Sequence, residues 1–391
     1  MRILFCNYEY PPLGGGGGVI NKQIAEELAR QHDVDVLTSL GPGLPKHSIE
    51  NGVSVHRVPV FFRTRQAAAN MPSMLAYLPS GYLTGRRLAR NKAYDVINTH
   101  FVVPTGPLGN WLSRRYEIPN VLSVHGGDLY DPSKWTSPHR HAFLRSSVRN
   151  LLRKADAVVG QSSNTLKNVY DYYDPDLECE CIPLGILRPD SQVSASRSSY
   201  GISETDTVLV TVGRLVSRKA VDQLIRVLGA IRDSSVHLFI IGSGPQEESL
   251  GKISQELGIS ERVHFLGQVE EQTKFELLRM ADVYVSTSQH EGFGIVYLEA
   301  MASGLPVICY DYGGQTDFLT SDVNGYVIKL NDIAAFQQAC ELLIEDPDLR
   351  KTFAERNLKD VEGFYIDRCA DRYLRIFEQV IDRRKAAGRA S

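Results

Sequence analysis

Short apolar runs alternate with helix-like segments along the whole chain, and this alternation limits the fold more than any other feature. Apolar runs that suit buried strands recur at 2–6, 34–38, 53–60, 95–99, 120–125, 156–160, 181–184, 207–213, 236–241, 263–266, 282–286, 306–310 and 326–329. Strands that are separated by crossover helices pair in parallel. The pattern therefore predicts an α/β fold made of two doubly wound, Rossmann-like domains.

A stretch rich in serine, proline and glycine, residues 185–206, separates the two halves. We therefore predict an N-terminal domain of residues 1–187 and a C-terminal domain of residues 188–368, which fits a chain of 391 residues. Residues 369–391 are expected to form a helix that packs back on the N-terminal domain. Ligands of such sheets bind at the carboxyl ends of the strands, so we expect the two domains to face each other across a cleft.

Five consecutive glycines, Gly14 to Gly18, lie between the first apolar run and a segment in which Ile20, Ile24 and Leu28 recur at helical spacing. A turn from a strand into a helix presents unpaired N–H groups and the positive end of the helix dipole. Without Cβ atoms, a phosphate or another chain can approach this backbone closely. We expect the loop to bind such a group, and a merely flexible connection is the alternative.

Two common phosphate-binding folds do not fit the chain. A dinucleotide-binding domain needs GxGxxG and an acidic residue at the end of the second strand. Here Val19 or Ile20 stands at the third glycine position, and the second strand ends in Thr38-Ser39. No GxxxxGK[ST] occurs, which excludes P-loop kinases. The phosphate that the glycines accommodate must belong to another chemistry.

Two basic residues follow the first strand of the second half. The segment VTVGRLVSRKAVDQLI (210–225) ends a strand at Val212, turns at Gly213, and then places Arg214 and Lys219 before a helix. A planar arginine fork and a lysine ammonium at the carboxyl end of a strand suit a diphosphate. Solvated surface cations are the alternative interpretation.

The segment SQHEGFGIVYLEAMASGLPVICYD (288–311) is more specific. Glu291 stands before a glycine-containing turn, and Glu299 follows eight residues later among apolar neighbours. We expect the N–H groups of Gly294 and Ile295, at the start of the helix, to bind an anion. Glu291 is then near the sugar hydroxyls, and Glu299 reaches a ribose diol. Because a lone buried carboxylate is unfavourable, a polar ligand explains Glu299 better than a capping or surface role.

Positive charge gathers in the first half, although the formal net charge is only −3. Residues 55–155 hold 15 Lys and Arg against 4 Asp and Glu. Within this window, apolar residues stand directly before basic ones: Met71, Met74, Leu75, Tyr77, Leu78, Tyr82 and Leu83, then Arg86, Arg87, Arg90 and Lys92, with a second basic cluster at Arg140, Arg145, Arg149, Arg153 and Lys154. We expect this surface to dock on an anionic membrane. A buried apolar face with solvated arginines is the alternative.

The termini and cysteines favour a cytoplasmic chain, peripheral on the inner face of the membrane. The first apolar run is too short for a signal peptide, and no stretch approaches the roughly 18 apolar residues of a membrane-spanning helix. The six cysteines are scattered without metal-ligand spacing, as expected in a reducing compartment. No nucleic-acid partner is expected.

Taken together, these segments resemble the retaining glycosyltransferases of family four, which have the GT-B fold. The shared motifs are the first glycine loop, Gly213-Arg214-Leu215 with Lys219, the turn Pro183-Leu184-Gly185-Ile186, and Glu291 to Glu299 within EAMASGLPVI. The resemblance covers essentially the full length. Two departures are Leu184, where the family usually has Asn, and Ala220, where Gly usually follows the lysine.

The resemblance implies roles for individual residues. Catalysis is expected from His125, Glu291, Arg214 and Lys219; donor binding from Gly16, Gly17, Arg214, Lys219, Gly242, Gln268, Val269, Glu291, Gly292, Phe293, Gly294, Ile295 and Glu299; and acceptor binding from Gly15, His100 and Asp128. From the residues alone, His125 at a strand end is more often a structural histidine than a ligand-binding one, and His100 is equally explained by either role.

The resemblance also implies the reaction. A nucleotide-diphosphate sugar, with UDP favoured over GDP, gives its sugar to an acceptor hydroxyl with retention, by front-face attack, and the acceptor is expected on a lipid-linked or cell-surface saccharide precursor. No metal or other cofactor is expected, because no DxD stands where a divalent ion would be held and cations can stabilise the leaving diphosphate. A nucleotide-sugar epimerase or phosphorylase of the same fold, a soluble small-molecule transferase and a non-catalytic binding module remain as alternatives.

Overall fold

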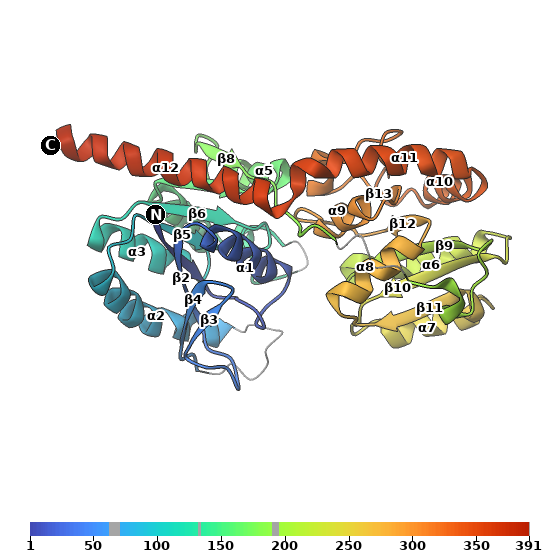
Figure 1. The fold of residues 1–391 in the computed structure, drawn as a ribbon, viewed down its shortest axis with the longest axis horizontal. Coiled ribbons are helices and arrows are strands. Elements are labelled where there is room, and N and C mark those ends of the chain that lie inside the picture. The colour runs from blue at the N-terminus through green and yellow to red at the C-terminus, as the bar shows by residue number, and fades with distance from the viewer. Residues whose placement is uncertain (62–70, 132–133, 190–194, 391) are drawn as a thin grey trace. The chain divides into compact units, whose positions relative to one another are not determined.

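The computed structural model describes residues 1–61, 71–131, 134–189 and 195–390 (Figure 1). The chain divides into two compact units: residues 1–185 together with 366–391, and residues 186–365. The boundary after residue 185 lies two residues before the expected one, and the boundary after residue 365 lies three residues before. The composition of a linker indicates a domain boundary only approximately. Each unit is an α/β domain built on a largely parallel sheet, which confirms the predicted fold class.

The first unit contains an eight-stranded sheet in the order β3-β4-β2-β1-β5-β6-β7-β8. Its strands are β1 (Arg2–Asn7), β2 (Asp33–Ser39), β3 (His47–Glu50), β4 (Val53–Val58), β5 (Val96–His100), β6 (Asn120–Val124), β7 (Ala157–Gly160) and β8 (Cys179–Cys181). All neighbours are parallel except β3, which pairs antiparallel with β4 in a hairpin that the sequence pattern did not predict. The strand order reverses between β1 and β5, so the carboxyl ends of these two strands flank a switch point, where α/β sheets bind ligands.

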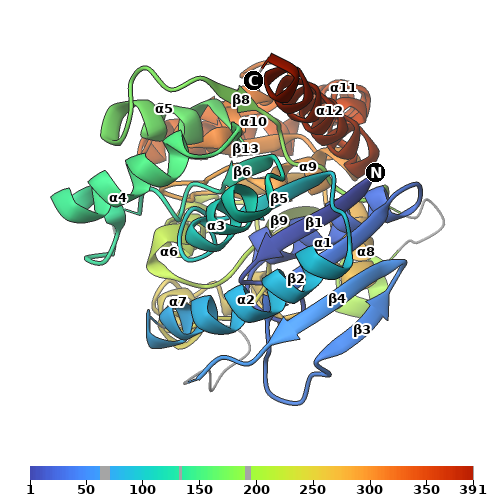
Figure 2. The same cartoon turned by 90° about the vertical axis from the view of Figure 1, so that its left-hand side faces the viewer.

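Helices cover both faces of this sheet. They are α1 (Gly16–Ala29), α2 (Met71–Asn91), α3 (Gly106–Tyr116), α4 (Ala142–Arg153), α5 (Ser163–Tyr172) and α12 (Ile366–Ala390). On one face, α2 and α3 lie side by side, and their Tyr77 and Leu108 pack on Leu4 and Cys6 of β1 (Figure 2). The C-terminal helix α12 belongs to this unit, where its Tyr373 hydroxyl bonds to Ser123 of β6 at 3.1 Å.

The second unit contains a six-stranded parallel sheet in the order β11-β10-β9-β12-β13-β14. Its strands are β9 (Thr207–Val212), β10 (Val236–Ile241), β11 (Val263–Gly267), β12 (Val283–Ser286), β13 (Val307–Tyr310) and β14 (Gly325–Ile328); its helices are α6 (Val221–Ala230), α7 (Glu247–Glu256), α8 (Glu271–Met280), α9 (Ile295–Ala302), α10 (Ile333–Glu345) and α11 (Pro347–Asp360). The switch point lies between β9 and β12. The segments that carry Lys219 and Glu291 follow these two neighbouring strands.

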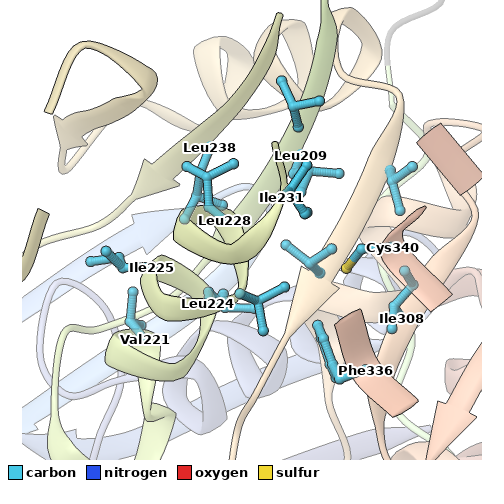
Figure 3. Close-up of a cluster of buried hydrophobic side chains, with 14 of the residues drawn as sticks. Leu209, Val221, Leu224, Ile225, Leu228, Ile231, Leu238, Ile308, Phe336 and Cys340 are labelled. Carbon is cyan, nitrogen blue, oxygen red and sulfur yellow. The ribbon is translucent and has the colours of Figure 1, made fainter. Parts of the chain in front are cut away.

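The core of the second unit forms between the sheet and α6 and α10. Leu224, Ile225 and Leu228 of α6 are buried together with Leu238 of β10, and Phe336 of α10 completes the cluster (Figure 3). These positions in α6 follow helical spacing, so one apolar stripe covers the sheet. Burial of a leucine or isoleucine side chain contributes about 1.5–3 kcal/mol.

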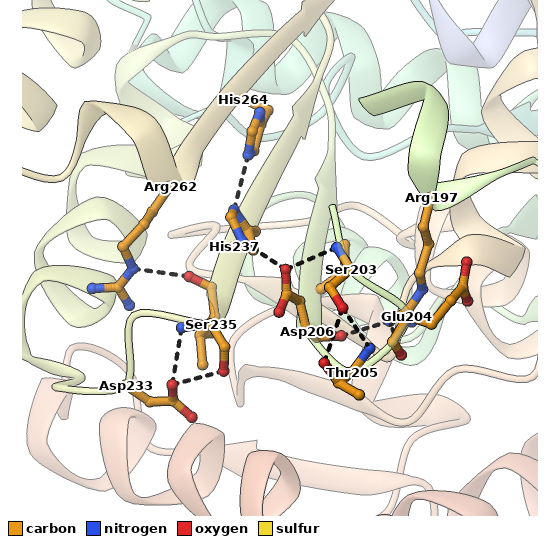
Figure 4. Close-up of polar contacts among 12 residues, drawn as sticks. Arg197, Ser203, Glu204, Thr205, Asp206, Asp233, Ser235, His237, Arg262 and His264 are labelled. Atoms are coloured by element: carbon orange, nitrogen blue, oxygen red, sulfur yellow. Dashed lines mark hydrogen bonds and ion pairs between the residues drawn. The ribbon is translucent and has the colours of Figure 1, made fainter. Parts of the chain in front are cut away.

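Polar contacts hold the amino ends of the second sheet. Arg197 donates to the Met280 carbonyl at 3.0 Å and to the Asp282 carboxylate at 2.9 Å, and Asp206 lies 3.4 Å from the imidazole of His237 (Figure 4). His237 in turn bonds to His264 at 3.1 Å. The carboxyl ends, at the opposite edge, carry the residues predicted to bind the donor.

The structure divides the residues expected on a membrane surface into buried and exposed groups. Tyr77 is fully buried and donates to the Leu37 carbonyl, and Lys92 pairs with the buried Asp35 at 2.7 Å, so these two residues stabilise the fold. Met74, Leu78 and Tyr82 are half-buried against the core. In the second basic cluster, Arg149 and Arg153 pair with Asp174.

A smaller apolar and basic stripe remains exposed on α2. Leu75 and Leu83 are 64% and 70% exposed, and Arg86, Arg87 and Arg90 follow them on the same helix. Phe143 of α4 and Trp135 are also exposed, at 80% and 76%. Within the described part of the chain, no helix is both long and apolar enough to span a bilayer.

We expect Gly242→Ala to destabilise the second unit by about 2 kcal/mol or more. Gly242 has a φ of 129°, and an added Cβ would lie 2.0 Å from the Gly213 carbonyl oxygen. The matched control is Gly251→Ala in α7, where a Cβ meets no atom within 4 Å; it should stabilise the protein by about 1 kcal/mol through helix propensity. Urea unfolding measures both, and equal effects of the two substitutions would contradict this account.

Candidate functional site

A buried ion pair lies at the switch point of the second unit. The Lys219 ammonium pairs with Oε1 of Glu291, and the Arg218 guanidinium lies 3.4 Å from Oε2 of the same carboxylate. Arg218 also donates to the His290 carbonyl. These side chains meet because the loops after β9 and β12 begin at adjacent strands. One carboxylate therefore faces two cations, which leaves an excess of positive charge.

The electrostatics of this cluster keep Glu291 ionised. Glu291 is only 8% exposed, and burial by itself raises the pKa of its carboxyl. Lys219 and Arg218 outweigh burial and hold the pKa at about 2. Near neutral pH this group accepts hydrogen bonds and does not donate a proton.

Arg214 and Lys219, the two cations expected at the diphosphate, lie in different environments. Arg214 is exposed, and its guanidinium makes no hydrogen bond or ion pair with the residues that the structure describes. The arginine that joins Lys219 at Glu291 is Arg218, which the sequence analysis did not select. The sequence feature that could have indicated Arg218 is its position directly before Lys219. Arg214 keeps its place at the carboxyl end of β9, with its donors available to a ligand.

Ala220, which follows Lys219, takes a φ of 45° and a ψ of 40° at the N-cap of α6. This left-handed conformation favours glycine, because a Cβ destabilises it. The departure from the family motif at this position therefore places a strained residue directly beside the ion pair.

Glu299 is buried but has a protein partner. The Lys274 ammonium of α8 donates to Glu299 at 2.7 Å and to Glu271 at 2.8 Å. Burial raises the pKa of the Glu299 carboxyl, and Lys274 offsets this only in part. Burial lowers the pKa of Lys274, but the carboxylates of Glu299 and Glu271 outweigh it and raise that pKa above its ordinary value. The inference that Glu299 is a lone buried carboxylate was thus wrong. Lys274 pairs with it, so no ligand is needed to explain its burial.

The turn before α9 combines structural and binding groups. Gly294 has a φ of 94° at the N-cap, and the N–H groups of Gly294 and Ile295 have no acceptor among the described residues. Phe293 is only 3% exposed and packs on Phe318 at 5.2 Å between ring centroids, so it supports the turn from within. Gly292 is half-buried. An α-helix that begins with unpaired amides favours an anion at this end.

The remaining residues predicted to bind the donor lie beside β10 and β11. The N–H of Gly242 donates to the Gly267 carbonyl at 2.7 Å, and its missing Cβ is required by the nearby Gly213 backbone. Its first role is therefore structural. Gln268 is exposed and Val269 half-buried directly after β11, at the carboxyl edge of the sheet.

In the first unit, the five consecutive glycines 14–18 differ in the space around them. Gly14 has a φ of 89°, and a Cβ on Gly17 would lie 2.8 Å from the ring of Phe101. Around Gly15 and Gly16, an added Cβ would meet nothing within 4 Å. Gly15 caps α1 and Gly16 begins it. Of the five glycines 14–18, these two therefore present bare backbone to open space, where a ligand can approach.

Two histidines pair at the carboxyl ends of β5 and β6. Nδ1 of His100 lies 3.0 Å from Nε2 of His125. His100 is fully buried and stacks on Phe5 at 5.4 Å, so it does not contact an acceptor in this structure, contrary to the sequence prediction. His125 is 8% exposed and packs against Phe101 at 4.4 Å.

Asp128 holds the loop that carries His125. Its carboxylate accepts the N–H groups of His125 at 3.0 Å and of Val102 at 2.7 Å, and the Gln161 amide donates to the His125 carbonyl at 2.8 Å. Burial raises the pKa of Asp128 to about 6. Asp128, expected to bind the acceptor, thus uses both oxygens on the backbone. Sequence reasoning missed Gln161 because it follows β7 as an ordinary polar residue.

No metal centre is visible in the part of the chain that the structure covers: no three His, Cys, Asp or Glu side chains gather in an arrangement that could hold an ion. The polar groups that do converge are cations and unpaired amides in the second unit, and neutral histidines in the first.

Comparison with known proteins gives a consistent result. Residues 192–360 match the family model described as glycosyl transferases group 1, and residues 15–185 match a glycosyl transferase 4-like domain. An uncharacterized glycosyltransferase of Methanocaldococcus jannaschii is 29% identical and aligns with 97% of this chain and 98% of its own. N-acetyl-alpha-D-glucosaminyl L-malate synthase of Bacillus anthracis is 25% identical, with 95% and 96% covered.

Among solved structures, HepE of Anabaena in complex with UDP superimposes with a TM-score of 0.78 at 20% identity and covers 97% of this chain and all of that one. This likeness concerns the fold.

We predict that the contribution of Glu291 to stability is lost in acid. Because its folded pKa of about 2 lies below the ordinary 4.5, the contribution is complete above pH 4.5 and falls as the pH drops toward 2. The difference in unfolding free energy between wild type and Glu291→Gln should shrink by about 2 kcal/mol between pH 7 and pH 3. Urea unfolding at both pH values measures it. The exposed control Glu256→Gln should show no such change, and a constant difference for Glu291→Gln would contradict the assignment.

Proposed function

The chain belongs to the group 1 glycosyltransferases, with a GT-B fold, and we propose that it transfers a sugar from a nucleotide-diphosphate donor to an acceptor hydroxyl. One observation carries this proposal: Lys219 and Arg218 converge on Glu291 at the switch point of the second sheet, directly before the unpaired amides that begin α9. An excess of cationic and N–H donors at that edge suits a diphosphate.

In the proposed reaction the bond between the anomeric carbon and the β-phosphate oxygen breaks, and its electron pair stays on the diphosphate. The acceptor oxygen bonds to the anomeric carbon on the same face, with retention, and its proton passes to the leaving phosphate oxygen. Lys219, Arg218 and the exposed Arg214 stabilise the developing charge together with the amides of Gly294 and Ile295. Glu291, held ionised, accepts hydrogen bonds from sugar hydroxyls.

The second carboxylate is assigned to the nucleotide. Glu299 lies about 6 Å along the axis of α9 from its first residue, Ile295, whereas Glu291 precedes the helix. The Lys274 partner occupies one of its oxygens, Oε1, so Oε2 remains to accept a ribose hydroxyl. Gln268 and Val269 are placed beside the base. We favour UDP over GDP as the nucleotide of the donor.

The first unit is proposed to receive the acceptor and the transferred sugar. The open space at Gly15 and Gly16 and the partly exposed His125 support this assignment. A lipid-linked or cell-surface saccharide precursor is the proposed acceptor class, because the exposed stripe on α2 is both apolar and basic.

The test is a panel of UDP-, GDP- and ADP-sugars, first by thermal shift and then by product analysis with and without acceptors. Binding of a donor raises the unfolding temperature by mass action.

With the active donor, Lys219→Met should lower kcat/KM by 10²-fold or more, because it removes a charge that stabilises the transition state. Arg226→Met, exposed on α6, is the control and should leave kcat/KM unchanged.

A product formed from the donor without any acceptor would favour an epimerase instead, and sugar phosphate formed from free phosphate would favour a phosphorylase. Binding without turnover of any donor would leave only a binding module.

Activity should survive EDTA. The proposed diphosphate site is lined by cations and amides, so the charge that a divalent ion supplies elsewhere comes from side chains here. Initial rates before and after dialysis against EDTA measure this. Complete inactivation that magnesium or manganese reverses would overturn the proposal of a metal-independent reaction.

We expect the full chain to bind liposomes that contain anionic lipid through its first unit. It should therefore float with them at low salt and less at high salt, because each basic residue near the membrane surface contributes about 1 kcal/mol to binding. Changing Arg86, Arg87 and Arg90 to Ser should abolish flotation. The matched control changes Arg375, Arg383 and Lys385, exposed on α12, to Ser and should float like the wild type. Lys92 stays unchanged, since it pairs with Asp35. Equal flotation of both variants would remove the membrane proposal.

A further inference from the structure

His100 and His125 form a hydrogen-bonded pair of imidazoles that leaves two ring nitrogens without partners. Nδ1 of His100 and Nε2 of His125 are 3.0 Å apart. The other two nitrogens, Nε2 of His100 and Nδ1 of His125, are buried and have no hydrogen-bond partner. The backbone of His125 is held separately by Asp128 and Gln161. Among the described residues, the contact at Nε2 of the His125 ring is the one with Nδ1 of His100.

Both rings are neutral near pH 7. Burial lowers the pKa of His125 to about 4 and lowers the pKa of His100 well below its ordinary value. A neutral imidazole has one N–H donor and one bare acceptor nitrogen. In the pair, one ring must donate and the other must accept, so the choice of donor determines the tautomer of both rings.

The two arrangements differ in where the second N–H is located. If His125 donates through Nε2, the unpartnered N–H is on Nε2 of His100, a residue with no exposed surface that lies between Phe5 and Tyr373. If His100 donates through Nδ1, the unpartnered N–H is on Nδ1 of His125, an atom that is also buried but belongs to a residue that keeps 8% of its surface exposed. A buried N–H without an acceptor costs about 1–3 kcal/mol in either arrangement, but only His125 reaches the surface, where a ligand can supply the acceptor.

We propose that His100 is a positioning residue that donates to Nε2 of His125 and so fixes the proton of His125 on Nδ1, as a donor for a hydroxyl of the transferred sugar. The identity of that ligand rests on the proposed function; the tautomer does not. The Phe5 ring stacked on His100 and the Phe101 ring against His125 keep the two imidazoles in register.

The direct test is a long-range proton–nitrogen NMR spectrum of the full chain labelled with ¹⁵N-histidine, without ligand. Protonated and bare ring nitrogens give well-separated signals, and His125→Gln identifies the signals of His125. We expect the His125 proton on Nδ1. A proton on Nε2 of His125 would overturn the proposal.

Three variants separate positioning from packing. His100→Phe keeps the stack on Phe5 but removes the donor, so the His125 proton should move to Nε2 or distribute over both nitrogens. His100→Asn places an amide where Nδ1 of histidine stands, so it should restore the wild-type tautomer. Phe5→Leu loosens the packing of His100 and leaves its donor in place; it should lower stability with the tautomer unchanged. An unchanged tautomer in His100→Phe would overturn the proposal.

Kinetics give the second readout. His100→Phe should lower kcat by about 10- to 100-fold, as the loss of an outer-sphere partner does elsewhere, with the Kd of UDP unchanged because the nucleotide is assigned to the second unit. His100→Asn should recover most of the loss. A fall in kcat with the tautomer intact counts against the proposal. If no donor is turned over, the proposed function fails, and the NMR result still decides the role of His100.

Discussion

Burial of the Glu291 carboxylate is the constraint on which the proposed donor site depends. A charge with 8% exposure is strongly unfavourable unless it is paired, and breaking such a pair costs about 3–5 kcal/mol. Lys219 provides the partner, and Arg218 adds a second cation. The loop after β9 is therefore tied to the loop after β12. Once these loops are joined, the start of α9 and the exposed Arg214 are brought to the same edge of the sheet.

The two units use different electrostatics at their sheet edges. The second unit gathers full charges: Lys219 and Arg218 on Glu291, and Lys274 on Glu299. The first unit gathers neutral imidazoles, since burial keeps His100 and His125 uncharged, and the Asp128 carboxylate there binds backbone amides. Charged groups suit a phosphate leaving group. Neutral donors and acceptors suit sugar hydroxyls, which they bind without strong desolvation.

Much of the fold followed from the sequence, because parallel strands are buried on both faces and read as continuous apolar runs. The strands expected along the chain are present as β1, β2 and β4 to β14, although β8 overlaps the expected run 181–184 only at Cys181. Of the five glycines expected in a loop, Gly14 and Gly15 precede α1, and Gly16 to Gly18 are already helical. The β3 hairpin strand was missed because its residues are partly exposed and lack an apolar run. The expected linker at 185–206 includes residues 190–194, which lie outside the described residues.

The sequence by itself determined the α/β class, the order of the elements and the chemistry near each strand end, because these depend on local periodicity and on residue type. Only the tertiary structure decided which side chains meet. Arg218 and Lys274 were not selected because their ion pairs join residues 73 and 25 positions apart in the sequence, and residue spacing does not predict contacts at such separations. His100 was expected to face a ligand, yet the stacked Phe5 buries it. Pairing partners depend on strand order, and strand order is a property of the folded sheet alone.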